Sequence, residues 1–306
     1  ELAEKAGSLR VYARVSPEPK VRIVRAIRSS GNSVSLNGCG VNAAPSLKAA
    51  DIGVAMGITG TDVAKGASDM ILTDDNFRTI VSAVREGRNI YENIRKAVHF
   101  LLSCNAGELL AIFSAILLGW ETPLLPIHIL WVNLITDTLP ALSLGMDPGS
   151  PDIMKRKPRD PSESLFSRGG IAIILNGILI GGLTLFAYRW GLSVYEGSLV
   201  HARTLAFAVL SISQLFHAFD LRNGEKSLAA IRPLGNRYLL GALFAGIALQ
   251  AAVIAVPSLS RVFKVFSLSG RDWLLVAGLA VVPIIANETG KFIGRVRRRS
   301  AGPPAP

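Results

Sequence analysis

Six long apolar segments constrain the fold more than any other feature of this 306-residue sequence. Each approaches the length of about 20 residues with which an α-helix crosses a bilayer. We therefore predict a membrane protein with six spanning helices. They cover residues 96–118, 126–145, 170–190, 200–219, 238–256 and 273–293.

The formal net charge of +11 is concentrated in particular loops. Lysine and arginine gather at 155–168, at 222–237 and at 291–299, whereas the loops around Glu121 and Glu196 contain fewer. This asymmetry predicts that both termini are cytoplasmic, although one external loop also carries three basic residues. No basic motif interleaved with aromatic residues indicates nucleic acid. We expect an integral, multi-pass protein of the plasma (inner) membrane whose partner is the lipid bilayer.

The residues before the first apolar segment predict a small α/β domain. Pro17 is suited to the first turn of a helix that Ser16 would cap, and Gly31 would end it. Alternating strands and helices predict a parallel sheet of βαβ units. The part is too short for a complete domain of this kind, so we expect a further strand upstream. The predicted strands are 11–15, 33–36, 52–56 and 70–73, with helices at 17–30 and 46–50 and a glycine-rich turn at 37–45.

A helical pattern begins at Asn76 and has no strong break before the first apolar segment. Its apolar residues recur at helical spacing, and charged residues lie between them. We predict one long helix that leaves the α/β domain as a stalk and enters the membrane near Lys96. The alternative is a loop followed by a separate span. The recurring apolar residues are Ile80, Val84, Ile90 and Ile94.

Two of the predicted spans carry polar residues at helical spacing. Asn105 and Glu108 are three residues apart in the first span, and Asn133, Thr136 and Asp137 share one face of the second. Carboxylates within a membrane are costly and usually face an ion pathway or a partner. Their oxygen atoms suit Ca²⁺ or a similar hard cation. We predict a cation site, although the asparagines alone would favour hydrogen bonds between packed helices.

Two residues beside the carboxylates predict local unwinding of these helices. Pro140 follows Asp137 by three residues. Gly107 precedes Glu108 directly. Unwinding would free backbone carbonyls as further ligands.

The remaining candidate ligands give weaker signals. Cys39 and Cys104 are too few for a disulfide framework or a zinc site. Asp220 and Glu288 lie near cytoplasmic span ends, where we expect them to be solvated. Four histidines lie near span ends without metal-ligand spacing, so we predict packing or interfacial roles for them. They are His99, His128, His201 and His217.

Residues 37–45 read Asn-Gly-Cys-Gly-Val-Asn-Ala-Ala-Pro. This run resembles the hinge motif of P-type cation-transporting ATPases, Thr-Gly-Asp-Gly-Val-Asn-Asp-Ala-Pro, and 11–20 and 69–77 are similar to the segments around it. The resemblance covers essentially the whole chain. It implies an α/β, partial haloacid-dehalogenase-like (Rossmann-like) phosphorylation domain with a stalk, followed by an all-α transmembrane bundle. The implied domains are 1–90, the six-helix cation-transport domain at 91–298, and a disordered tail at 299–306.

Pumps of this family transfer the γ-phosphoryl group of ATP to an aspartate with the help of Mg²⁺. By resemblance, Lys20 matches the lysine that contacts the phosphoryl group. Asn42 matches a polar residue that orients the site. Gly38 and Gly40 would let the backbone approach the phosphate closely.

The sequence departs from the family pattern at this site. Cys39 and Ala43 stand where the family has aspartates, and Asn37 replaces a threonine. The family aspartate at position 39 is a Mg²⁺ ligand, and sulfur is a poor substitute for oxygen on this cation. The Asp-Lys-Thr-Gly-Thr phosphoacceptor motif is absent from these residues, as are the actuator domain, the nucleotide-binding domain and the first four spans. We expect no ATP hydrolysis by this chain alone.

Residues 103–108 and 130–137 look like the fifth and sixth spans of sarcoplasmic-reticulum-type calcium pumps. The resemblance implies that Asn105, Glu108 and the three polar residues of the second span are all cation ligands. Gln214 matches a glutamate of two-site calcium pumps that is glutamine in plasma-membrane-type pumps. This predicts one strong site and one weakened site.

Three hypotheses follow. In the first, the chain is the C-terminal portion of an ATP-driven P-type pump, with Ca²⁺ as the expected ion ahead of Mn²⁺, Na⁺, K⁺ or H⁺. In the second, it is a non-catalytic, degenerate or truncated relative that binds cations or regulates a partner without ATP hydrolysis. In the third, it is a membrane-anchored phosphatase. That hypothesis is weak because an anchor would not need Glu108 and Asp137.

Overall fold

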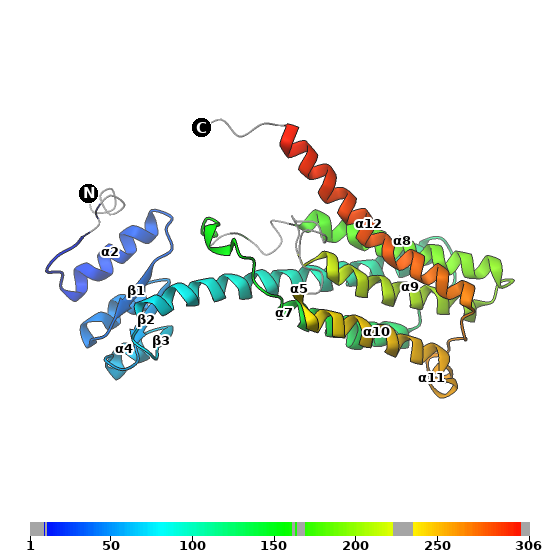
Figure 1. The fold of residues 1–306 in the computed structure, drawn as a ribbon, viewed down its shortest axis with the longest axis horizontal. Helices are drawn as coiled ribbons and strands as arrows, with labels where there is room; N and C mark the ends of the chain where they lie inside the picture. The colour runs from blue at the N-terminus through cyan, green and yellow to red at the C-terminus, as the bar shows by residue number, and fades with distance from the viewer. Residues whose placement is uncertain (1–8, 10, 161–162, 164–168, 223–234, 301–306) are drawn as a thin grey trace. The chain divides into compact units, whose positions relative to one another are not determined.

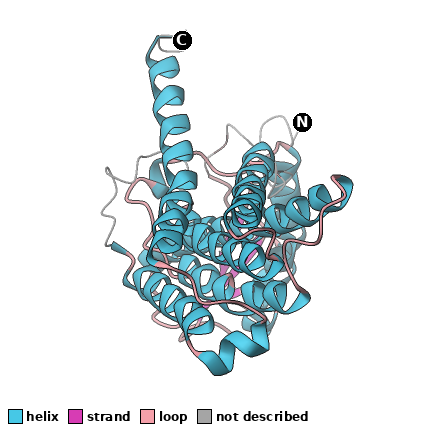
Figure 2. Ribbon diagram, turned by 90° about the vertical axis from the view of Figure 1, so that its right-hand side faces the viewer, coloured by secondary structure: helices cyan, strands magenta, loops and turns pink. Residues whose placement is uncertain are grey.

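The computed structural model describes residues 9, 11–160, 163, 169–222 and 235–300. The chain divides into two compact units. Unit 1 comprises Glu1–Arg88 and Asp152–Glu163, and unit 2 comprises Asn89–Pro151 and Ser164–Pro306. Most of the described backbone is helical, and the strands belong to unit 1 (Figure 2).

Unit 1 is built around a parallel three-stranded sheet in the order β1–β2–β3. Ser35 of β1 pairs with Ile52 of β2, and Val54 of β2 pairs with Met70 of β3. The short helices α3 and α4 form the connections, which confirms the predicted parallel βαβ arrangement. The elements are β1 (Ser35–Gly38), η1 (Val41–Ala43), α3 (Ala44–Ala49), β2 (Ile52–Met56), α4 (Asp62–Gly66) and β3 (Met70–Leu72).

The predicted strand at 11–15 is wrong. These residues form no strand, and Val11 is exposed. Strand-forming residues need a neighbouring strand, and none of the described strands pairs with this segment.

Helix α2 (Pro17–Ser29) confirms the predicted helix and its two ends. Gly31 takes a φ of +80° just after the helix, and its amide bonds to the Arg28 carbonyl at 2.9 Å. Ser16 occupies the N-cap position as predicted, although its side chain makes no capping hydrogen bond. Arg28 also pairs with Asp51 at 2.8 Å, which ties the end of α2 to the loop before β2.

The two faces of β2 carry separate small cores, because successive side chains of a strand point to opposite faces. Ala55 packs with Leu47 and Ala64 from the connecting helices. Val54 packs on the other face with Leu72 and Ile80.

Helix α5 (Phe77–Leu117) is continuous over 41 residues (Figure 1). This confirms the prediction of one long helix, and the alternative of a loop with a separate span is wrong. Asn76 caps it, since its side-chain oxygen accepts a hydrogen bond from the Arg78 amide at 3.0 Å.

Six helical segments of the described chain are long and apolar enough to cross a membrane, which confirms the predicted number. The second of them is interrupted by a π-helical turn. The segments are α5, α6–η2–α7 (Pro126–Trp131, Val132–Thr136 and Thr138–Gly145), α8 (Gly170–Val194), α9 (Leu199–Asp220), α10 (Arg237–Ala255) and α12 (Gly270–Ser300). The shorter helices are η3 (Ile153–Lys155) and α11 (Pro257–Phe263). Helix α12 continues to Ser300, and the rest of the predicted tail lies outside the described residues.

Helix α9 is the most buried span of unit 2, and α8, α10 and α12 all pack against it (Figure 1). Helices α5 and α8 approach closely through small residues. A Cβ on Gly177 would lie 2.7 Å from the Cβ of Ala106, and one on Gly181 would lie 2.8 Å from the Gly107 carbonyl oxygen. Gly107 therefore serves helix packing, and the prediction that it unwinds α5 is wrong, because the helix continues through it.

Candidate cation-binding site

Three spans of unit 2 meet at the Glu108 carboxylate. Asn133, in the π-helical turn, donates a hydrogen bond from Nδ2 to Glu108 Oε2 at 3.2 Å. Gln214 of α9 donates from Nε2 to Glu108 Oε1 at 3.2 Å. Glu108 itself is only 4% exposed. A carboxylate buried in this way depends on such partners, because an isolated charge away from water is costly.

Asp137 supplies a second buried carboxylate directly after the π-helical turn. The Asp137 amide bonds to the Val132 carbonyl at 2.9 Å, five residues back. Pro140 has no amide to bond to the Thr136 carbonyl, as residue i+4 of a helix would. The predicted local break in this span is confirmed.

The Asp137 side chain is fully buried, and neither carboxylate oxygen forms a hydrogen bond among the described residues. The Glu108 carboxylate is close enough to influence it electrostatically, and the Cys104 thiol lies nearby. A buried acceptor without partners requires an explanation, and a bound ion is one of those that apply most often. Two neighbouring carboxylates repel each other, and a cation between them would offset that repulsion.

The other predicted ligands differ in their surroundings. Thr136 is buried, and its hydroxyl donates to the Val132 carbonyl at 3.0 Å, which leaves its oxygen able to accept or coordinate. Gln214 is buried, and its side-chain oxygen has no hydrogen-bond partner among the described residues. Asn133 and Asn105 are exposed in this chain. The structure thus joins Glu108, Asn133 and Gln214 by hydrogen bonds and leaves Asn105 outside that set.

The donor atoms are oxygens of carboxylates, amides and a hydroxyl, a set suited to a hard cation. Among the described residues, no three side chains of the His, Cys, Asp and Glu types are arranged to hold a metal ion. Any ion bound here would therefore need amide or carbonyl oxygens beside the two carboxylates.

The predicted phosphoryl site lies at the carboxyl end of β1, an edge at which parallel sheets often bind ligands. A Cβ on Gly38 would lie 2.4 Å from the Cβ of Ala43, so this glycine permits close packing of strand and turn. Gly40 has open space beside it. Asn42 and Lys20 are exposed side chains.

The residues present at this edge do not fit a Mg²⁺ ion. Cys39 exposes a thiol, and Ala43 offers no oxygen. Mg²⁺ takes oxygen ligands and binds sulfur poorly.

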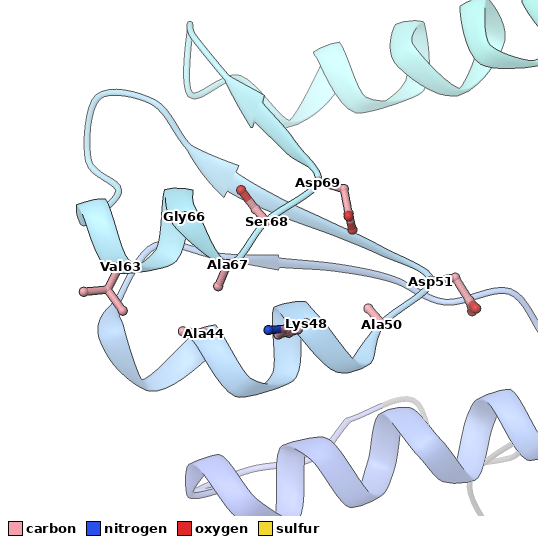
Figure 3. Close-up of a pocket in the computed structure, with 9 residues that line it drawn as sticks. All are labelled: Ala44, Lys48, Ala50, Asp51, Val63, Gly66, Ala67, Ser68 and Asp69. Carbon is pink, nitrogen blue, oxygen red and sulfur yellow. The ribbon is translucent and has the colours of Figure 1, made fainter.

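A hollow of about 470 Å³ lies elsewhere on unit 1, beside α3 and α4 (Figure 3). Its two carboxylates are already engaged. Asp69 accepts a hydrogen bond from the Gly53 amide at 2.8 Å, and Asp51 pairs with Arg28. None of the predicted site residues lines it.

Sequence reasoning missed a polar row along α9. His217, predicted to be interfacial or packed, is fully buried, and neither ring nitrogen has a hydrogen-bond partner among the described residues. Asp220, predicted to be solvated, is buried and pairs with Lys291 at 2.6 Å. The sequence feature that could have revealed this row is its spacing, because Gln214, His217 and Asp220 recur every three residues and so share one face of the helix.

Sequence reasoning also missed a buried ionic cluster where several spans of unit 2 end. Asp147 accepts from Lys96 at 2.8 Å, from Arg222 at 2.9 Å and from Asn236 at 3.0 Å. The cluster joins α5, the segment just after α7, the end of α9 and the start of α10. The polar residues are too far apart in sequence for any local pattern to reveal it.

Known proteins resemble this chain over most of its length. The family model described as "Cation transporting ATPase, C-terminus" matches residues 121–293. A calcium-transporting ATPase 1 of Bacillus cereus is 56% identical over 95% of the chain and 35% of its own length. A calcium-transporting ATPase of Bacillus subtilis is 49% identical over 92% of the chain and 32% of its own length. An endoplasmic-reticulum-type calcium-transporting ATPase 2 of Arabidopsis thaliana is 35% identical over 97% of the chain and 34% of its own length. The chain spans about a third of the length of these relatives.

Proposed function

Because this chain belongs to the cation-transporting P-type ATPases and matches their C-terminal part, we propose that it supplies the ion-binding spans of an ATP-driven pump. We propose Ca²⁺ as the transported ion. The names of the relatives support this choice, and the oxygen donors of the site are compatible with it.

One observation carries the proposal. The buried Glu108 carboxylate is held by Asn133 and Gln214 from two other spans, and the buried Asp137 carboxylate has no hydrogen-bond partner among the described residues. Such an arrangement is costly unless a ligand uses it. A Ca²⁺ ion would bind both carboxylates together with the unpartnered Gln214 oxygen.

The exposed amides Asn105 and Asn133 would complete the site in the intact pump. They lie on surfaces that the first four spans, supplied by the N-terminal part, would cover. Gln214 brings an oxygen without a charge, so we propose one strong cation site and one weakened site.

Unit 1 would be the end of a haloacid-dehalogenase-like phosphorylation domain. Its parallel sheet supports this assignment. Lys20 and Asn42 would contact and orient the phosphoryl group of ATP. Gly38 and Gly40 would let the backbone approach that group closely. The continuous helix α5 would link phosphorylation to the Glu108 site, since it contains residues of both units.

We propose that the six spans lie in the plasma membrane with both termini in the cytoplasm. The basic residues at 155–159, 222–237 and 291–299 support this orientation.

The test joins this chain to the N-terminal two thirds of the Bacillus cereus relative. Vesicles containing the chimera with Cys39→Asp and Ala43→Asp, which restore carboxylates at the phosphoryl site, are expected to take up Ca²⁺ when ATP is added. Glu108→Gln and Asp137→Asn should each abolish uptake, whereas Glu121→Gln, in a loop, should not. Uptake that survives both carboxylate changes would refute the proposed site.

A second function is favoured by a specific observation at the end of β1. Cys39 exposes a thiol, and Ala43 carries no oxygen, where the family has aspartates. The chain would then bind cations without supporting ATP hydrolysis. Phosphoenzyme formation separates the two functions. If the chimera forms no acid-stable phosphoenzyme but its Cys39→Asp, Ala43→Asp variant does, the non-catalytic function is correct for the natural sequence.

A further inference from the structure

His128, near the start of α6, is fully buried, and both of its ring nitrogens form hydrogen bonds. The Leu125 amide donates to Nδ1 at 3.3 Å, so Nδ1 must be the acceptor nitrogen. Nε2 therefore carries the proton and donates a hydrogen bond to the Phe263 carbonyl of α11 at 2.8 Å. These two backbone partners fix a single neutral tautomer and the orientation of the ring.

Aromatic contacts hold the same part of α6 from other sides. The His128 ring stacks on Phe207 of α9, with 4.4 Å between the ring centroids and 15° between the ring planes. Trp131, three residues later on the same face of α6, meets the Phe263 ring edge to face with the centroids 5.1 Å apart. Its Nε1 also donates to Gln250 Oε1 of α10 at 3.0 Å. Helix α6 is thus clamped by α9, α10 and α11.

This clamp ends where the span is broken. Helix α6 ends at Trp131, and the π-helical turn begins at the next residue. Asn133, the second residue of that turn, donates to Glu108 Oε2 at 3.2 Å. Helix α7 is separated from Asn133 by the irregular turn and by the backbone bond that Pro140 cannot form. The orientation of Asn133 therefore depends more on the clamped residues before it than on α7.

We propose that His128 is a positioning residue for the cation site. Its hydrogen bonds go to backbone groups outside the proposed ligand set, so it acts through α6, which it holds in the orientation from which Asn133 reaches the Glu108 carboxylate. The inference rests on the proposed function, because it concerns a residue that serves the same site. A histidine with a packing role alone would contribute only to the stability of the fold, and cation affinity would then follow stability.

The experiment measures equilibrium binding of radiolabelled Ca²⁺ to the 306-residue chain in lipid nanodiscs. His128→Leu and His128→Gln are a matched pair, because glutamine can still donate to the Phe263 carbonyl and leucine cannot. His128→Leu is expected to weaken Ca²⁺ binding about tenfold, the lower end of the cost of changes around direct ligands. His128→Gln should keep most of the wild-type affinity. Phe207→Leu, which removes the ring stack but neither hydrogen bond, should lower Tm without this loss of affinity.

A double-mutant cycle separates positioning from packing. An Asn133→Ala background lacks the residue through which His128 acts, so His128→Leu should weaken Ca²⁺ binding no further there. Equal losses of affinity with and without Asn133 would overturn the inference. Affinities that simply follow Tm across the variants, with His128→Gln no better than His128→Leu, would also overturn it.

A measurement made without Ca²⁺ keeps the inference distinct from the proposed function. The side-chain amide resonance of Asn133, identified by its loss in Asn133→Ala, reports the bond to Glu108 in a chain with isotope-labelled asparagine. It should shift in His128→Leu and stay near its wild-type position in His128→Gln. If it does so but the chain binds no Ca²⁺, the proposed function fails while the role of His128 in placing Asn133 stands. If Ca²⁺ binding requires Glu108 but the resonance is the same in all three forms, the positioning role is refuted and the proposed function stands.

Discussion

Gln214 Nε2 donates a hydrogen bond to Glu108 Oε1 at 3.2 Å, which joins α9 to α5 within unit 2. An amide at this position holds the carboxylate without adding charge, and its own oxygen faces the interior without a partner among the described residues. The pair thus limits the negative charge available to a cation.

Replacing the Gln214 amide by a carboxylate tests whether position 214 sets the negative charge at the cation site. Gln214→Glu places a further carboxylate beside Glu108, so repulsion should destabilise the chain when a chelator removes divalent cations. Ca²⁺ should offset the repulsion, and the Ca²⁺-dependent rise in Tm should exceed that of the wild type. Thermal unfolding with and without Ca²⁺ measures both effects. A Tm shift equal to that of the wild type would show that position 214 does not contact the ion.

Close packing between α5 and α8 gives a second prediction. Gly177→Ala would bring a Cβ to 2.7 Å from the Cβ of Ala106, so we expect a loss of about 1–3 kcal/mol in the free energy of unfolding. Gly182→Ala on the same helix is the matched control, because no atom lies within 4 Å of its added Cβ. Gly182→Ala should raise the free energy of unfolding by no more than about 1 kcal/mol, because alanine is the better helix former. Equal effects of the two changes on denaturant unfolding would contradict the described packing.

The Asp147 cluster gives a third prediction. Asp147→Asn removes the charge that Lys96 and Arg222 both approach within 3 Å, and the side chain of Asp147 is only 3% exposed. Breaking a buried ion pair in this way costs about 3–5 kcal/mol. The control is Lys155→Gln, whose ion pair with Asp152 is exposed and should contribute less than about 1 kcal/mol. Similar losses for the two variants in chemical unfolding would refute a special role for the cluster.

A fourth prediction concerns pH and unit 1. The Thr59 hydroxyl and the Ile58 amide donate to the Asp75 carboxylate, and these bonds lower its pKa to about 2. The folded pKa is below the value of about 3.9 for an unfolded aspartate. The stabilisation from Asp75 is therefore complete above about pH 4 and is lost as pH falls through about 2.

Thr59→Val removes the largest contribution while keeping a β-branched side chain. The pKa of Asp75 should then rise toward its ordinary value, as measured by NMR titration of the carboxyl carbon. Asp74, whose pKa is lowered chiefly by the Thr79 hydroxyl, is the internal reference and should shift much less than Asp75, because the charge of Asp75 is the smallest of the influences on its pKa. An unchanged Asp75 titration would mean that the Thr59 bond is absent in solution.

Much of this architecture was predictable because hydrophobic length and periodicity reflect the surroundings of each helix directly. The six spans and the continuous α5 follow from such patterns. The break before Asp137 was predictable because Pro140 removes a specific amide. The prediction of local unwinding at Gly107 failed, because a glycine in a helix can serve either flexibility or close packing. Only its neighbours on α8 decide between the two.

The candidate site was predictable only in part. The spacing of Asn133 and Asp137 placed both on one span, and Glu108 stood out as a carboxylate within an apolar segment. The bond from Gln214 depends on how α9 packs against α5, and 106 residues separate the partners. The Asp147 cluster and the burial of His217 and Asp220 are likewise products of tertiary packing, which a single sequence does not encode at short range.

The most direct test of the central claim is equilibrium binding of radiolabelled Ca²⁺ to the chain in nanodiscs. We predict saturable binding that Asp137→Asn and Glu108→Gln each weaken at least tenfold, because even changes around direct ligands cost about 10–100-fold in metal affinity. Glu121→Gln, a carboxylate change in an exposed loop, should leave binding unchanged. Binding that is insensitive to Asp137 and Glu108, or equally sensitive to all three changes, would contradict the claim that these two buried carboxylates form the cation site.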